Sequence, residues 1–168
     1  LKNKQTDRAI SYIQEIRKSE LEADHYIQTE NIVVNALLSE KVSLAKKYNI
    51  KVQLSISDLH DSFVSDRDWC VILANLFDNA IEAASQVVVN REIIIKIEEV
   101  AYGMVLVVKN TFQGEVVDAG GDLVTTKENK EEHGFGFENV KFAVSKYNGI
   151  IQRRCIKNIF QVCVVLYR

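Results

Sequence analysis

The chain has 168 residues and is 47% apolar, enough for one domain with a real hydrophobic core and a small additional segment. Its formal net charge is -2, and the basic residues are scattered rather than banded, which argues against nucleic-acid binding. No apolar run reaches the roughly eighteen residues of a membrane span, and no signal peptide opens the sequence. We expect a soluble chain, and because it begins inside an expected helix, a piece of something longer.

The cysteines Cys70, Cys155 and Cys163 each fall within an apolar helix or strand pattern. Their spacing fits neither a metal-binding pair nor a disulfide framework. We therefore expect them to be small core residues in a reduced, cytosolic protein.

The N-terminal part is predicted to be helical in two segments. Residues 3–28 carry apolar side chains on one side in a nearly heptad pattern, which Arg17 to Glu20 interrupt. Because roughly two to three heptads do not form a stable coiled coil alone, we expect one helix of a helical hairpin or dimeric bundle. A second helix is expected to follow a cap at Thr29 or Asn31 and to end near Tyr48.

Alternating apolar side chains predict a first strand over residues 51–57. A polar loop and a central helix follow. Residues 92–100 and 104–109 are rich in β-branched residues, and Gly103 lies between them, so they predict a β-hairpin.

Glycine is confined to the second part of the chain. None precedes Gly103, there is no proline, and five of the seven glycines lie between Gly114 and Gly136. Residues 111–133 show no convincing periodicity, and a loop of some twenty residues in a compact domain is usually a functional lid or disordered. We expect a lid here, in a region built for bending or for cradling a ligand.

Regular structure is expected to resume after this lid. A helix is predicted over residues 134–146, ended by Asn148 and Gly149, and two strands over 150–156 and 159–167. The order helix, strand, helix, strand, strand, lid, helix, strand, strand predicts a two-layer α/β (α+β) sandwich with a mixed, mostly antiparallel sheet.

The central helix, from Ser65 to Gln86, carries polar residues in an unusual place. At about 100° per residue, six polar side chains share an arc of roughly 100°, and apolar side chains cover nearly all the rest. A surface helix usually shows the opposite proportions. Something polar is therefore expected against this line, although a thin solvated strip would give the same pattern. The six residues are Asp68, Asn75, Asp78, Asn79, Glu82 and Gln86.

Three features together suggest a phosphate-binding site. Asn75 and Asn79 are neighbouring amides on the central helix, and an amide oxygen suits Mg²⁺ beside phosphates. Asn110 closes a strand, where its amide could bond the edge of an adenine. Residues 133–136, His-Gly-Phe-Gly, open a helix, and a glycine pair there leaves backbone N–H groups pointing outward, which suits phosphate.

Together and in this order, these residues resemble the GHKL ATPase superfamily, named for gyrase, Hsp90, histidine kinases and MutL. Residues 75–83, NLFDNAIEA, resemble its N-box, and residues 133–140, HGFGFENV, resemble its second glycine box. The resemblance covers about residues 29–168. Residues 31–48, the Thr-Thr-Lys step at 125–127 and the H-G-x-G form are most similar to peptide-sensing histidine kinases of the accessory gene regulator C type, which implies quorum sensing.

The resemblance implies a Bergerat-type sandwich with helices on one face of the sheet, and ATP and Mg²⁺ as ligands, with Asn79 as the Mg²⁺ ligand. The hydrolytic branches have a glutamate at position 75 to activate water, whereas Asn75 cannot take a proton near neutral pH. We therefore expect ATP to be held without efficient hydrolysis and its γ-phosphoryl group to pass to an acceptor.

The resemblance also implies a wider set of binding residues. Lys127 is a candidate phosphate contact, with a solvated loop lysine as the alternative. Asp78 and Glu82 could orient Asn79 or line the pocket, or have ordinary hydrogen-bonded roles. The catalytic candidates are Asn75 and Lys127. The nucleotide-binding candidates are Asn75, Asn79, Asn110, Lys127, His133, Gly134, Phe135, Gly136 and Asn139, the last being either near the phosphates or a cap-region amide.

The sequence departs from the family pattern at the first glycine box, D-x-G-x-G. Residues 110–114 read Asn-Thr-Phe-Gln-Gly, so Asn110 stands where the family has the aspartate that accepts a hydrogen bond from the adenine amino group. Its amide oxygen could accept the same bond, and its NH₂ could donate to a ring nitrogen. No clear phenylalanine box is present.

By resemblance, residues 1–29 are part of the second helix of a dimerisation and phosphoacceptor hairpin, and residues 30–168 are the catalytic ATP-binding domain, with its lid over about 111–133. His25 lies on the wrong helix to be the acceptor, so we expect the acceptor histidine upstream of this chain. The implied partners are a second copy in the full-length homodimer, the upstream histidine helix and a response regulator. The implied location is the cytoplasmic portion of a membrane-anchored receptor.

Two alternatives remain open at the level of sequence. One is a nucleotide-responsive interaction module that binds a partner without phosphoryl transfer, which the missing first glycine box and acceptor would fit. The other is an anti-sigma-type serine kinase of the same fold, which usually keeps the acidic base and lacks a dimerisation hairpin.

Overall fold

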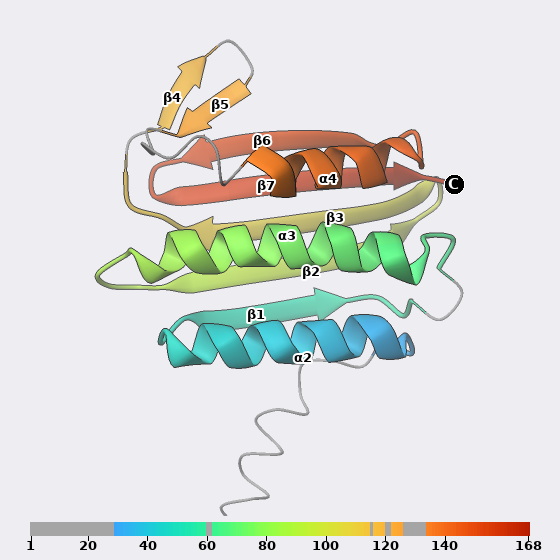
Figure 1. Cartoon of the computed structure of the whole chain (residues 1–168), viewed down its shortest axis with the longest axis horizontal. Coiled ribbons are helices and arrows are strands. Elements are labelled where there is room, and N and C mark those ends of the chain that lie inside the picture. The colour runs from blue at the N-terminus through green and yellow to red at the C-terminus, as the bar shows by residue number, and fades with distance from the viewer. Residues whose placement is uncertain (1–28, 60–61, 115, 120–121, 126–133) are drawn as a thin grey trace, which may run out of the picture.

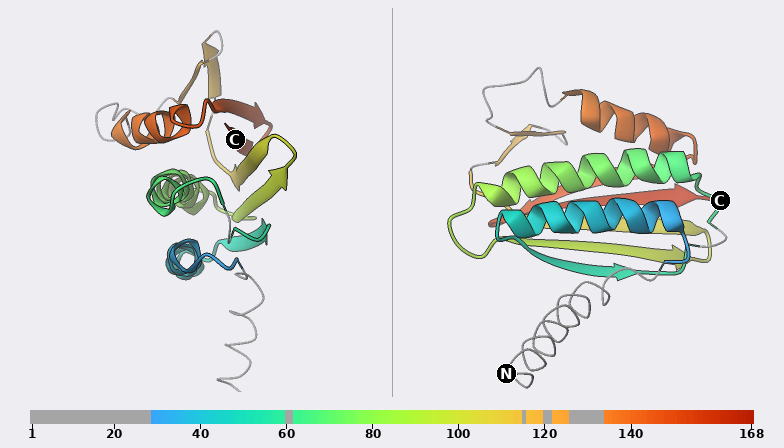
Figure 2. Two further views of the ribbon diagram at one scale, coloured as in Figure 1. Left: turned by 90° about the vertical axis from the view of Figure 1, so that its right-hand side faces the viewer. Right: turned by 60° about the horizontal axis from the view of Figure 1, so that its bottom comes forward.

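The chain forms two layers, a five-stranded sheet with three helices on one of its faces (Figures 1 and 2). The computed structural model describes residues 29–59, 62–114, 116–119, 122–125 and 134–168. The helix predicted over residues 3–28 lies outside the described residues. The predicted α/β sandwich with a mixed, mostly antiparallel sheet and helices on one face is confirmed, and the opposite face of the sheet is open.

The strand order of the main sheet is β1-β2-β3-β7-β6. β1 (Lys51–Ile56) runs parallel to β2 (Glu92–Val100), because the chain crosses over between them through helix α3 (Asp66–Ser85). All other pairs are antiparallel: β2 with β3 (Gly103–Thr111), β3 with β7 (Ile159–Tyr167), and β7 with β6 (Ile150–Ile156).

The three helices begin where the sequence predicts them. α2 (Ile32–Lys47) is capped by the Asn31 side chain, which accepts a 2.9 Å hydrogen bond from the Val34 N–H. α3 is capped by Ser65, whose hydroxyl oxygen accepts from the Asp68 N–H at 3.2 Å. Each cap satisfies a backbone donor that the first turn leaves unpaired. α4 (Gly134–Ser145) follows the expected lid.

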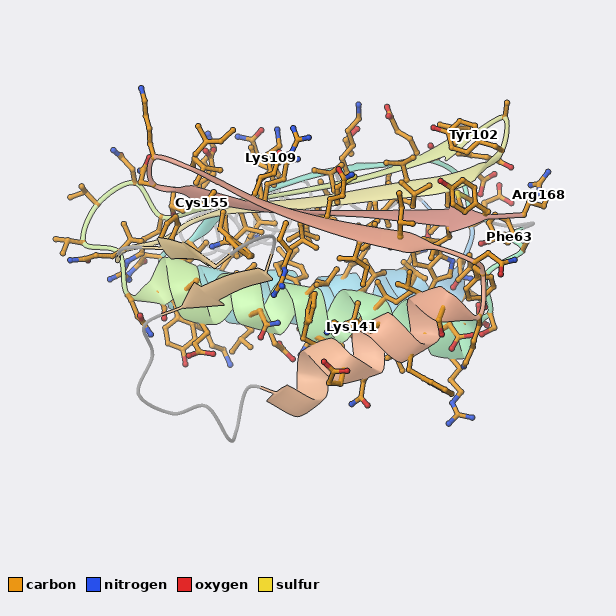
Figure 3. The ribbon with its side chains drawn as sticks, turned by 90° about the horizontal axis from the view of Figure 1, so that it is seen from above. Phe63, Tyr102, Lys109, Lys141, Cys155 and Arg168 are labelled. Atoms are coloured by element: carbon orange, nitrogen blue, oxygen red, sulfur yellow. The ribbon has the colours of Figure 1, made fainter. Side chains whose placement is uncertain are left out.

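The core lies between the sheet and the three helices, and α3 runs along its centre (Figure 1). Alternation along β2 places Ile93, Ile95 and Ile97 inward, each with no exposed surface. The Trp69 side chain is fully buried at the start of α3. Burying an aliphatic or aromatic side chain of this size contributes about 1.5–3 kcal/mol. The opposite face of the sheet carries residues such as Lys109, which projects away from the helices (Figure 3).

The turn between β2 and β3 depends on glycine. Gly103 has φ of +154°, and a Cβ there would lie 1.9 Å from the carbonyl oxygen of Leu166 on the paired strand β7. No other residue fits without moving that strand.

Two predictions are wrong in detail. The absence of regular structure over residues 111–133 does not hold, since β4 (Val116–Ala119) and β5 (Asp122–Thr125) pair as a separate antiparallel hairpin. Strands this short carry too few residues for alternation to stand out, although the glycine pair at 120–121 between valine-containing runs is typical of a hairpin.

The cysteines are the second difference, because all three thiols are free and only half-buried rather than part of the core. Burial raises the pKa of Cys70, helped by the negative charge of Asp66, and burial alone raises the pKa of Cys155. These two thiols are therefore protonated at neutral pH and are weak nucleophiles. Among the described residues, no helix combines the length and apolar character needed to cross a bilayer.

Candidate functional site

Three chain segments that carry candidate residues lie toward the same end of the molecule. The C-terminal part of α3, the end of β3 and the start of α4 all lie on the left in Figure 1, next to the β4–β5 hairpin. The opposite end of the α3–α4 pair carries the start of α3 and the end of α4. The two ends of this helix pair bury different polar groups.

The N-box helix touches the glycine box directly. Gly136, in the first turn of α4, lies so close to α3 that a Cβ on it would be 2.7 Å from Oδ1 of Asn75. The Asn75 amide nitrogen donates a 2.6 Å hydrogen bond to the carbonyl oxygen of Val71, one turn earlier in α3. This bond turns the carboxamide oxygen toward α4. The two boxes that the sequence separates are therefore in contact.

Asn79 and Asn139 are exposed. Asn79 lies one turn after Asn75 on α3, and no hydrogen bond ties its side chain to another described residue. The oxygen and the NH₂ group of its carboxamide can therefore both bind a ligand. Among the described residues, no cluster of histidine, cysteine and acidic side chains could hold a metal by itself. A single amide oxygen, that of Asn79, fits Mg²⁺, which commonly takes few protein ligands and completes its shell with phosphate oxygens and water.

Asn110 is a buried polar residue, 4% exposed, on the helix-facing side of β3 next to Phe160 of β7. Its amide nitrogen donates a 2.9 Å hydrogen bond to the carbonyl oxygen of Thr111. One N–H of the amide is thus bonded within the protein, and the carboxamide oxygen is the acceptor that the side chain can offer.

Asp68 belongs to the same polar line of α3 but not to the same end of the molecule. Its carboxylate is 6% exposed and accepts hydrogen bonds from Lys146 Nζ at 2.6 Å, the Tyr147 hydroxyl at 2.7 Å and the Ser65 hydroxyl at 2.8 Å. Burial by itself would raise the pKa of Asp68, but these hydrogen bonds and the Lys146 charge outweigh it and hold the pKa below its usual value. The residue fastens the start of α3 to the turn that follows α4.

Asp78 also has a partner away from the amides. Its carboxylate pairs with Lys41 of α2 at 2.7 Å, with the Asp78 side chain half exposed. The polar line along α3 is therefore divided. Asp68 is bonded to Lys146 and Tyr147 in the turn after α4, Asn75 contacts the glycine box, and Asp78 pairs with α2. Three of its six residues are exposed, as the alternative of a solvated strip expects: Asp78, Asn79 and Gln86.

One neighbour of the glycine box could not be anticipated from the motifs. The guanidinium carbon of Arg153, on β6, lies 4.7 Å from the centre of the Phe137 ring, and Lys141 Nζ lies 5.4 Å from the same ring. Figure 3 marks Lys141 on α4. Arg153 occupies an inward-facing position of its strand, between Ile151 and Cys155. A cation among apolar residues on that side of the strand was the one sequence feature that could have indicated this contact.

Of the remaining candidate residues, the structure describes only those at the start of α4. Gly134 and Phe135 begin α4, where backbone N–H groups are free of helical partners. Lys127 and His133 lie outside the described residues. The structure thus brings Asn75 against Gly136, places Asn79 one turn away and places Asn110 toward the same end of the molecule.

These features define the class of the protein: an α/β sandwich domain with an open sheet and an amide-bearing helix packed against a glycine-rich helix start. The particular family follows from the sequence of residues 64–166, which matches the GHKL domain family, and the chain belongs to that family. No curated protein is similar enough to the chain to count as a match.

Several solved structures share the fold. The catalytic domain of the histidine kinase ThkA is 18% identical, with 80% of this chain and 89% of that chain covered and a TM-score of 0.62. The Acinetobacter baumannii histidine kinase AdeS is 15% identical, with 97% and 80% covered and a TM-score of 0.61. The mycobacterial sensor histidine kinase MprB is 15% identical, with 80% and 91% covered and a TM-score of 0.58. At these identities the likeness is one of fold.

Proposed function

We propose that this chain is the catalytic, ATP-binding domain of a sensor histidine kinase in two-component signalling. It binds Mg-ATP and transfers the γ-phosphoryl group to a histidine outside this chain. Membership of the GHKL family and a fold shared with histidine kinase catalytic domains support the proposal. The observation that carries it is Asn75: an amide, not a carboxylate, lies against the glycine box, so no base for activating water stands at this position.

Each candidate residue has a role that its surroundings allow. The free Asn79 amide oxygen would hold Mg²⁺, which supplies charge neutralisation on the phosphates when bound. The backbone N–H groups at the start of α4, at residues 134–136, would bind phosphate oxygens. Lys127 would contact the phosphates, and His133 and Asn139 would flank them.

Asn110 fits the adenine in spite of the missing aspartate. Because its amide nitrogen already donates to Thr111, its oxygen would accept the hydrogen bond from the adenine amino group.

The transfer step needs little covalent chemistry from this chain. A nitrogen of the acceptor imidazole forms a bond to the γ-phosphorus, the bond from that phosphorus to the β–γ bridging oxygen breaks, and ADP leaves. Catalysis is then mainly positioning and charge neutralisation. In the whole protein, which we propose to be a membrane-anchored homodimer, a response regulator aspartate would receive the phosphoryl group.

The test supplies this chain with a fragment that carries an acceptor helix and with γ-labelled ATP. Transfer of label in an acid-labile, base-stable form supports the histidine kinase. Acid-stable label favours the serine kinase, ATP binding without transfer favours a nucleotide-responsive interaction module, and no Mg-ATP binding overturns all three readings.

Within the histidine kinases, we propose the peptide-sensing, accessory gene regulator C type, on the strength of the Thr-Thr-Lys step at 125–127 and the H-G-x-G form. The test measures autophosphorylation of the full-length protein in vesicles, with and without peptides secreted by its own cells. A change in autophosphorylation on adding a peptide fraction supports the assignment. Autophosphorylation that no peptide fraction changes contradicts it.

A further inference from the structure

The contact between α3 and α4 at Gly136 depends on a single side chain. The three atoms nearest to a Cβ built on Gly136 all belong to Asn75: Oδ1 at 2.7 Å, Cγ at 3.6 Å and Cβ at 4.0 Å. A separation of 2.7 Å is far below carbon–oxygen van der Waals contact. The methyl group of alanine at position 136 would therefore collide with the Asn75 carboxamide. No other residue comes closer to that position than Asn75.

Asn75 does not simply rotate out of the way. Its amide nitrogen is held by the 2.6 Å hydrogen bond to Val71, which keeps the carboxamide oxygen facing α4. Moving the oxygen means breaking that bond in a half-buried setting. Glycine is also a poor helix former, so its presence inside the first turn of α4 needs a physical reason. The Asn75 oxygen supplies one.

We propose that Asn75 is a positioning residue, and that Gly136 is glycine because Asn75 needs the space. The carboxamide acts as a spacer that sets how closely the first turn of α4 lies against α3. It thereby aims the backbone N–H groups of residues 134–136 at the nucleotide. The effect on nucleotide rests on the proposed function, whereas the spacing itself does not.

The competing explanation is that glycine leaves room for the phosphates. The two explanations differ in what an added methyl group would meet: the Asn75 carboxamide in one case and the ligand in the other. Only in the first case does shortening Asn75 remove the conflict.

The experiment compares wild type, Gly136→Ala, Asn75→Ala and the double variant by Mg-ATP calorimetry. Gly136→Ala alone should weaken binding about tenfold, within the range of coupling energies between contacting residues. In the Asn75→Ala background the same substitution should change affinity by less than about twofold, because the contact is gone. An equal loss in both backgrounds means that the methyl group meets the ligand, and it overturns the proposal.

A second measurement needs no nucleotide. Urea unfolding of the same four proteins should show non-additive shifts of the midpoint for positions 75 and 136. The matched control pairs Gly136→Ala with Asn79→Ala, one turn away on α3 and not among the atoms that the Cβ would meet, and its shifts should add. Additive shifts for Asn75 with Gly136 overturn the spacer. If wild type binds no Mg-ATP, the proposed function fails, and unfolding still decides the contact.

Discussion

The polar line of α3 has different surroundings near the start of the helix and from its middle onward. At Asp68 a buried carboxylate accepts three side-chain hydrogen bonds, from Ser65, Lys146 and Tyr147. The Asn75 amide is hydrogen-bonded only to Val71 of its own helix and faces the backbone of Gly136. The next amide, Asn79, is exposed. Near Asp68 the protein itself uses most of the hydrogen-bonding capacity, whereas around Asn75 and Asn79 that capacity stays available.

This difference separates structural from functional polar residues on one helix. A buried charge must be paired by its own protein, because burial without partners is costly. A residue that serves a ligand must keep a donor or acceptor unfilled until the ligand arrives. Sequence periodicity groups both kinds together, and only their partners distinguish them. Substitution of Asp68 should therefore change mainly stability, and substitution of Asn79 should change mainly nucleotide binding.

The largest expected effect is on binding, at Asn79. Asn79→Ala should lower Mg-ATP affinity by about 100-fold or more, since even outer-shell partners of a metal cost about 10- to 100-fold. The free energy of unfolding should stay the same or rise slightly, because alanine is a better helix former at an exposed position. Calorimetry and urea unfolding measure the two quantities. Unchanged affinity would remove Asn79 from the site.

The converse effect is expected at Asp68. Asp68→Ala should lower the free energy of unfolding by about 2–3 kcal/mol, the typical worth of hydrogen bonds to a charged group. Mg-ATP affinity at a temperature where the variant is folded should stay within about twofold of wild type. The control is Asp66→Ala, an exposed carboxylate in the same first turn, with a loss below about 1 kcal/mol. Equal losses from both variants would contradict the special role of Asp68.

Asn110 tests whether one residue can have both kinds of role. Asn110→Asp restores the family's aspartate but removes the donor to the Thr111 carbonyl, so unfolding free energy should fall by about 1–3 kcal/mol. Because an acceptor remains, Mg-ATP affinity should be kept, whereas Asn110→Ala should lower it. Urea unfolding and calorimetry of both variants check this. A stabilised Asn110→Asp variant would show that the bond to Thr111 is unimportant.

The fall in unfolding free energy at acid pH should depend in part on Asp68. Its pKa in the folded protein lies below the ordinary value of 3.8, so the folded state binds a proton less readily than the unfolded chain. The resulting stability is fully present above about pH 4 and is lost as pH falls through the lowered pKa. The difference in unfolding free energy between wild type and Asp68→Asn should therefore shrink from about pH 6 to about pH 2. A difference that is constant over this range would mean an unshifted carboxyl.

The smallest effect is expected at Asp78, the residue before Asn79 on α3. Its ion pair with Lys41 is half exposed on the carboxylate side, and such pairs contribute about 0–1 kcal/mol. Asp78→Ala should change unfolding free energy by no more than this and leave Mg-ATP affinity within about twofold. Calorimetry beside Asn79→Ala makes the comparison. A large loss of affinity would mean that Asp78 orients Asn79 after all.

The sequence by itself determined the strands of the main sheet, the three helices packed on it and the family of the protein. Helix and strand periods, the caps at Asn31 and Ser65, and the order of elements predict the sandwich, because each depends on neighbours a few residues apart. The N-box and glycine box are likewise local strings. They indicated an amide-and-glycine site before any contact was known.

Only the tertiary structure decided which polar residues are bonded within the protein and stabilise the fold. Asp68 meets Tyr147 across 79 positions of sequence, and Asn75 meets Gly136 through helix packing that no local pattern encodes. Arg153 lies over the Phe137 ring for the same reason. Local propensity fixes the direction in which a side chain points along its own element. Its partner depends on how separate elements pack, and that is a property of the folded core as a whole.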